Sequence, residues 1–138
     1  MRRLLALAAL ALAACSSDPV DEEEAEPPAT PNETDETLTA IPDAFLGVWD
    51  YVEGSCNPAS DLRVEIAPMQ VTFYESVGEV EAVEGGADEV TVVMQMSGEG
   101  ETWRNEQVFR LADGGSILET DDPAPGGEGK LRRSKCPA

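Results

Sequence analysis

The residues of this chain best able to do chemistry are its three cysteines and its many carboxylates. Cysteine occurs as Cys15, Cys56 and Cys136, and 28 aspartates and glutamates are spread over 138 residues, while histidine is absent. Without histidine the chain has neither a Ser-His-Asp nor a Cys-His nucleophilic arrangement, and no imidazole for a zinc site. Two carboxylates could act as acid and base, but nothing in the spacing of so many acids singles out one pair. We therefore expect no catalytic activity, no cofactor and no bound metal.

The first fourteen residues have the pattern of an export signal. Arg2 and Arg3 precede an unbroken apolar run over residues 4–14, which is too short to cross a bilayer, since that takes about 20 residues, but suits a signal-peptide core. The run ends in Leu12-Ala13-Ala14-Cys15, which resembles the lipobox of bacterial lipoproteins. An ordinary secretory signal, cut at an Ala-x-Ala site within the run, is the alternative reading.

The lipobox resemblance implies a membrane anchor and a cellular location. In that family, cleavage would remove residues 1–14 and leave Cys15 as the first residue, with its thiol diacylated and its amino group usually acylated as well. Each buried CH₂ contributes about 0.8 kcal/mol, so two or three acyl chains hold a protein firmly. Ser16 follows the cysteine, and by resemblance to enterobacterial sorting a serine there favours the outer membrane. We expect a lipid-anchored protein at the periplasmic face of the outer membrane.

Acylation of Cys15 would leave two cysteines for other chemistry. An export signal implies an oxidising compartment, in which Cys56 and Cys136 are expected to form a disulfide. That bond would close a loop of about 80 residues, which the chain-entropy model values at roughly 4 kcal/mol. Two reduced, buried thiols, or a metal pair completed by carboxylates, are the alternatives.

A strongly acidic segment separates the lipobox from the rest of the chain. Residues 16–40 hold nine acidic residues, four prolines and no basic residue, so they cannot bury enough apolar surface to offset the entropy of ordering. We expect residues 15–40, the lipidated cysteine included, to be a disordered linker. After cleavage, seven basic residues remain against the 28 acidic ones, a net charge near −21. Such a charge argues against nucleic acid as a partner.

Residues 41–138 are predicted to form a single all-β domain. Leu62, Val64 and Ile66 alternate with polar residues, as is typical of a half-buried strand. Glycine pairs such as Gly114-Gly115 indicate turns rather than a phosphate-binding loop. Short strands at regular spacing indicate an antiparallel meander closed into a small barrel of about 7–8 strands, with a β-sandwich as the alternative. The expected strands are residues 45–52, 62–66, 69–74, 77–84, 89–97, 101–111, 116–119 and 130–135.

A short motif on the first expected strand resembles that of a known family. Gly47-x-Trp49, preceded by Phe45, looks like the signature that opens lipocalins and other calycins. In those barrels the tryptophan closes one end, and an arginine from a late strand packs on it. The resemblance implies that Gly47 and Trp49 close this barrel together with Arg132 or its neighbour Arg133. The domain is much shorter than a lipocalin, so a large ligand cup is not expected.

Three weaker patterns have structural explanations. Met94 and Met96 alternate on an apolar strand, which favours the core over a copper site. Asp121-Asp122 and Glu128 lack the spacing of a calcium-binding loop. The last expected strand is basic and could form a binding patch, but pairing with acids on neighbouring strands is favoured. Its cations are Lys130, Arg132, Arg133 and Lys135.

We expect a non-catalytic binding or interaction module in the periplasm. This expectation combines the anchor, the linker, the disulfide and the barrel with the lack of a recognisable set of catalytic residues in the sequence. Its expected partners are the membrane, through the lipid, and either another envelope protein or a small apolar ligand. One alternative is a lysozyme inhibitor, because length, disulfide and anchor resemble small barrel lipoproteins of that kind, and Ser97-Gly98 before Trp103 resembles their inhibitory loop. A calycin-type carrier of small hydrophobic ligands is another, and a glycan-processing enzyme is the weakest.

Overall fold

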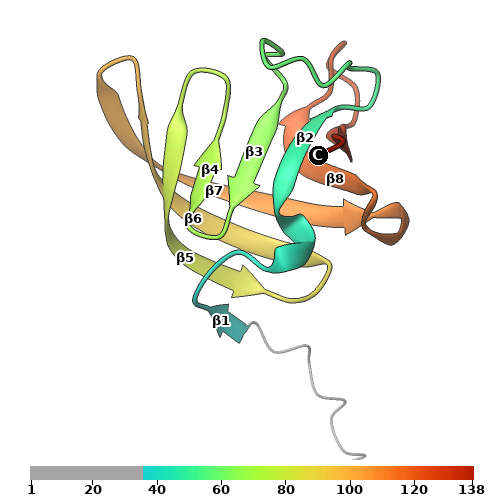
Figure 1. Cartoon of the computed structure of the whole chain (residues 1–138). Coiled ribbons are helices and arrows are strands. Elements are labelled where there is room, and N and C mark those ends of the chain that lie inside the picture. The colour runs from blue at the N-terminus through green and yellow to red at the C-terminus, as the bar shows by residue number, and fades with distance from the viewer. Residues whose placement is uncertain (1–35) are drawn as a thin grey trace, which may run out of the picture. The chain divides into compact units, whose positions relative to one another are not determined.

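Residues 36–138, the part of the chain that this computed structural model describes, form a closed antiparallel β-barrel (Figure 1). Eight strands, β2 to β9, form the barrel, which closes where β5 pairs with β6, and β1 is a ninth strand on the edge of β5. The predicted all-β barrel is therefore confirmed. The predicted signal peptide, the lipidation site Cys15 and most of the predicted linker lie outside the described residues.

All eight predicted strands are present, but two are shorter than predicted. The first begins only at Gly47, because Phe45 lies in a 3-10 helix, and the third spans residues 70–72 instead of 69–74. The strands are β1 (Glu36–Leu38), β2 (Gly47–Tyr51), β3 (Val64–Ala67), β4 (Gln70–Thr72), β5 (Val77–Gly85), β6 (Glu89–Gly98), β7 (Glu101–Ala112), β8 (Ile117–Pro123) and β9 (Lys130–Lys135). Two short 3-10 helices, η1 (Asp43–Phe45) and η2 (Asp113–Gly115), precede β2 and β8. The seventh strand is longer than predicted, because β8 continues to Pro123 in pairing with β9. In residues 36–138 no helix is long and apolar enough to cross a membrane.

The end of the predicted linker is ordered, which corrects the sequence-based boundary at residue 40. Residues 36–38 pair antiparallel with β5, with Glu36 opposite Gly85 and Leu38 opposite Val83. Leu38 also packs against the core. Acidic composition did not predict this strand, which is held by backbone pairing with β5 and by the packing of a single apolar side chain, Leu38.

The interior of the barrel is filled at the end where β2 begins. Helix η1 lies across that end with Phe45 fully buried, and the backbone N–H of Ile41 donates to the carbonyl of Pro68 in the β3–β4 turn. The alternating residues of β6 predicted to face inward are all buried. The core consists of Ile41, Phe45, Trp49, Val64, Ile66, Val71, Val83, Val90, Val92, Met94, Met96, Phe109 and Leu118. We call the end of the barrel where β2 begins the closed end.

Four connections gather at the opposite end of the barrel, because the strands are antiparallel. They join β2 to β3, β4 to β5, β6 to β7 and β8 to β9 (Figure 1). The first of them carries Cys56, which is disulfide-bonded to Cys136 just after β9, with the two Cα atoms 5.8 Å apart. The predicted disulfide is confirmed. The bond ties the β2–β3 loop to the end of β9, where the backbone N–H of Cys136 donates to the carbonyl of Val48 near the start of β2. We call the end of the barrel that carries the four connections the mouth.

Candidate functional site

The barrel interior is open at the mouth, where two clefts adjoin. The first, of about 390 Å³, has apolar walls and several polar groups, and we call it the mouth cleft. Its lining is Leu62, Phe73, Ser76, Met96, Trp103, Asn105, Gln107, Asp122, Pro123, Leu131 and Arg133. The second, of about 380 Å³, lies on the rim and is lined by Glu75, Ser76, Gly98, Glu99, Glu101 and Trp103. Ser76 and Trp103 belong to both clefts.

Trp103 forms the shared wall of these clefts. It lies near the start of β7, directly across from Met96 on β6, and 43% of its surface is exposed. The sequence places Trp103 on the same strand face as Gln107 and Phe109, and both of these are buried. The face is as predicted, but the packed interior ends below Trp103. A large aromatic ring is therefore left on the rim, with one side toward the barrel and one toward solvent.

Two buried polar side chains line the deeper part of the mouth cleft. The Arg133 guanidinium, 5% exposed, donates through Nε to the carbonyl of Leu62 at 2.7 Å and through Nη1 to Thr120 Oγ1 at 3.0 Å. Burial lowers the pKa of Arg133, and the nearby carboxylates of Asp122 and Asp50 act against that shift. Gln107 is 8% exposed and lines the cleft, and among residues 36–138 no buried side-chain N or O atom lacks a hydrogen-bond partner, so its carboxamide is open to the cleft. The cleft therefore offers hydrogen-bonding groups at its base beneath apolar walls.

The loop between β2 and β3 is held in place by one buried carboxylate. Asp50 is fully buried and accepts hydrogen bonds from the backbone N–H groups of Tyr51 and Cys56, each at 2.9 Å, and from Ser60 Oγ at 2.6 Å. A carboxylate can accept several such bonds, and charge-assisted bonds are the stronger kind. Asp50 thereby fixes the loop that carries Cys56 to its disulfide and Leu62 to the mouth cleft.

Gly47 and Trp49, two of the predicted barrel-closing residues, lie near the start of β2 at the closed end, but neither Arg132 nor Arg133 is the cation over the tryptophan. Trp49 is fully buried and its Nε1–H donates to the carbonyl of Phe45 at 2.8 Å. Lys135 Nζ lies 5.1 Å from the ring centroid of Trp49, which is its partner across β2 and β9. Gly47 has φ +123°, and a Cβ there would lie 3.1 Å from Lys135 Cε, so glycine leaves room for this side chain. The structure thus gives Lys135 the position expected of Arg132.

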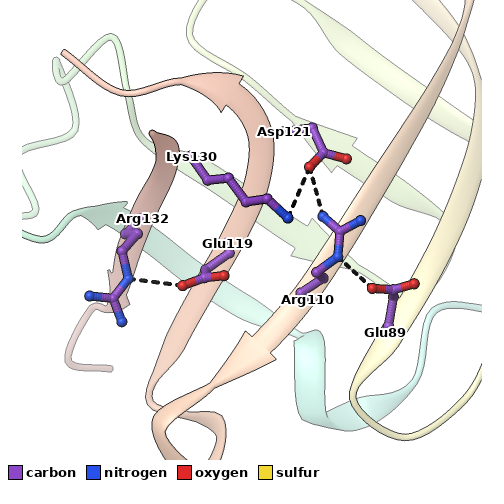
Figure 2. A network of polar contacts seen from close by, with 6 residues as sticks. All are labelled: Glu89, Arg110, Glu119, Asp121, Lys130 and Arg132. Carbon is purple, nitrogen blue, oxygen red and sulfur yellow. Dashed lines mark hydrogen bonds and ion pairs between the residues drawn. The ribbon is translucent and has the colours of Figure 1, made fainter. Parts of the chain in front are cut away.

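Arg132 instead belongs to a polar network on the outer face of β7, β8 and β9 (Figure 2). Its Nε contacts Glu119 at 3.0 Å, while Lys130 contacts Asp121 at 3.3 Å. The Arg110 guanidinium beside Asp121, at 2.8 Å, holds the pKa of that carboxyl below its usual value, and Lys130 acts in the same direction. Of the four cations of the last strand, Lys130 and Arg132 pair with acids as expected. Arg133 is instead buried against Leu62 and Thr120, and Lys135 lies over Trp49.

Neither metal chemistry nor a known relative identifies the site. Residues 36–138 contain no group of three or more histidine, cysteine or acidic side chains placed to hold a metal ion. No protein-family model, no curated protein and no solved structure matches this chain. The geometry of the mouth is therefore the basis for a functional assignment. Sequence reasoning did not identify this cleft, although a tryptophan two residues after a hairpin turn, on the inward face, was a usable signal.

Proposed function

We propose that this protein is a non-catalytic binding module of the cell envelope whose barrel takes a small amphipathic ligand at the mouth. The observation that carries the proposal is the mouth cleft. Its volume of about 390 Å³ falls within the usual range of small-molecule sites. Such sites combine apolar walls with a few fixed polar groups, which here are supplied by Asn105, Gln107 and Arg133.

The filled closed end supports a small ligand rather than a long one. Trp49, Phe45 and Phe109 are fully buried there, so a ligand in the mouth cleft would meet a packed interior beneath it. The Asp50 hydrogen bonds and the disulfide hold the β2–β3 loop, which supplies Leu62 to the lining of the cleft. A pre-formed site loses less conformational entropy on binding than a mobile one.

The proposal includes a lipid anchor at Cys15 on the periplasmic face of the outer membrane. Its support is the lipobox motif Leu12-Ala13-Ala14-Cys15. The described domain begins at β1, which pairs with the last residues of β5 at the closed end (Figure 1). The chain therefore enters the domain at the end opposite the mouth. A tether attached there leaves the mouth free to face away from the membrane.

A pair of tryptophan substitutions on β7 tests ligand binding in the mouth. Residues 15–138 carrying Cys15→Ser, made without lipid, are titrated with Nile red, a neutral apolar dye whose fluorescence rises on leaving water. We expect saturable binding that Asn105→Trp abolishes, because residue 105 lines the cleft. Glu106→Trp, which adds the same ring on the exposed side of the strand, should leave binding unchanged. Equal binding by both variants, or no saturable binding by the parent chain, would refute the proposal.

A further inference from the structure

The rim of the mouth is acidic because two hairpin turns approach each other closely. Glu75 lies in the β4–β5 turn, and Glu99 and Glu101 flank the β6–β7 turn, all three exposed beside Trp103. A Cβ at Gly98 would lie 2.6 Å from the carbonyl oxygen of Glu75, so only glycine allows this approach. The three acidic residues therefore line one cleft together with the exposed Trp103.

No cation of the described chain balances these rim carboxylates. Each of the seven cations in residues 36–138 has another partner. Five of them form ion pairs with other acids: Arg63 with Glu65, Arg104 with Glu81, Arg110 with Glu89 and Asp121, Lys130 with Asp121, and Arg132 with Glu119 and Asp113. Arg133 is buried beneath the cleft, and Lys135 lies over Trp49. None of these seven cations is paired with Glu75, Glu99 or Glu101. The negative charge of the rim acids is therefore not neutralised by any cation of residues 36–138.

The mouth cleft marks this region as a ligand site independently of the acids. Gln107 is 8% exposed, lies deeper along the same strand face as Trp103, and has no hydrogen-bonding partner among residues 36–138. No side-chain N or O atom of residues 36–138 is both buried and unpartnered, so the carboxamide of Gln107 faces the solvent in the cleft, where a ligand group can take the place of water. The base of the cleft therefore suits a hydrogen-bonding group, its walls suit an apolar body, and its rim suits a positive charge.

We propose that the mouth selects positively charged amphipathic small molecules, organic amines with an apolar body. This inference rests on the proposed function and adds the ligand's chemical class. The body enters the mouth cleft against Met96 and Trp103 and reaches Gln107. The ammonium group lies at the rim, over the indole of Trp103 and beside the Glu75, Glu99 and Glu101 carboxylates. Tryptophan is the best of the aromatic side chains at attracting a cation over its face.

Three small molecules of one shape but different charge test this selectivity. Tyramine, tyrosol and phloretate share a phenol ring and end in an ammonium, a hydroxyl and a carboxylate. The mature chain with Cys15→Ser is titrated with each while its two indole N–H signals are followed by NMR. We expect tyramine to bind about tenfold more tightly than tyrosol, with phloretate weakest, and the preference to shrink as salt is added. The Trp103 signal should move, while that of Trp49, bonded to Phe45, should stay.

Matched charge variants assign the preference to the rim. The test variant carries Glu75→Gln, Glu99→Gln and Glu101→Gln, and we expect it to bind tyramine no more tightly than tyrosol. The control carries Glu79→Gln, Glu84→Gln and Glu106→Gln, three exposed acids outside both clefts, and should keep the preference. Both variants change the net charge by the same amount. A control that loses the preference equally would overturn the assignment to the rim.

The remaining outcomes separate this inference from the proposed function. Equal binding of the three compounds, or tightest binding of phloretate through Arg133, would overturn the charge selection and leave the mouth as a ligand site. Absence of binding by all three compounds would overturn the amine proposal, and Nile red would then decide whether the mouth binds ligands at all. A shift of both indole signals together would place binding elsewhere and overturn the inference.

Discussion

Replacing both Cys56 and Cys136 by alanine removes the covalent link between the β2–β3 loop and the end of β9. The two cysteines are separated by 80 residues, so the disulfide restricts most of the unfolded domain. The chain-entropy relation for a loop of that length gives about 4.5 kcal/mol at 25 °C. Domains of this size have a total stability of about 5–15 kcal/mol. The expected loss is therefore a large share of the free energy of unfolding.

Urea unfolding measures this loss directly. The fluorescence of Trp49, buried at the closed end, reports disruption of the core in the parent chain and in the double variant. We expect the midpoint to fall and the m-value to rise, because the unfolded chain without the crosslink is less compact and exposes more surface. The parent chain reduced with dithiothreitol is the matched control and should behave like the variant.

A small effect would contradict this reasoning. If the double variant loses less than about 1 kcal/mol with an unchanged m-value, the disulfide does not restrict the unfolded state as the loop length requires. The antiparallel pairing of β2 with β9 would then be sufficient to keep the barrel closed.

Three other substitutions test separate parts of the account. Cys15→Ser should move the protein from the membrane fraction to the soluble fraction and abolish labelling by palmitate, whereas retention on membranes without label would contradict the lipobox reading. Asp50→Ala should lower the free energy of unfolding by about 3 kcal/mol in urea, because three donors lose a buried carboxylate; a loss under about 1 kcal/mol would contradict this role. For Asp121, the folded pKa is below the value of 3.8 for the free group, so its ion pairs stabilise the fold above that value and are lost as pH falls through the folded pKa. Asp121→Asn should therefore lose less stability than the parent chain on acidification from about pH 4 to about pH 2, and parallel pH profiles would contradict the assignment.

The barrel could be predicted from sequence because its signals are local. Alternation on β6 placed Met94 and Met96 inside, and glycine-containing turns set the strand limits. Pairing of Cys56 with Cys136 followed from the number of cysteines once Cys15 was assigned to the lipid. Side-chain alternation, glycine turns and the cysteine count can all be read along the chain without knowing which strands pair.

The features that were missed depend on how distant strands align. Lys135 rather than Arg132 covers Trp49 because the register of β9 against β2 sets which cation lies opposite the ring. Alternation along β9 alone cannot supply that register. The strand β1 was missed because its partner is the edge of β5, 45 or more residues later in the chain.

The mouth cleft was missed for a related reason. Whether Trp103 is buried or stands on a rim depends on how far the packed interior extends along β7, which is set by side chains of several other strands. The acidic rim likewise needs the close approach of the turns carrying Glu75 and Glu99, which Gly98 permits. Sequence alone gave no reason to place these residues together.

Intermolecular nuclear Overhauser effects test most directly whether the mouth is a ligand site. They are recorded between tyramine and the mature chain carrying Cys15→Ser. We expect contacts from the ring protons of tyramine to the Met96 methyl group and the Trp103 indole, both in the mouth cleft. Contacts only to Met69, an exposed apolar residue in the β3–β4 turn at the closed end, would contradict it.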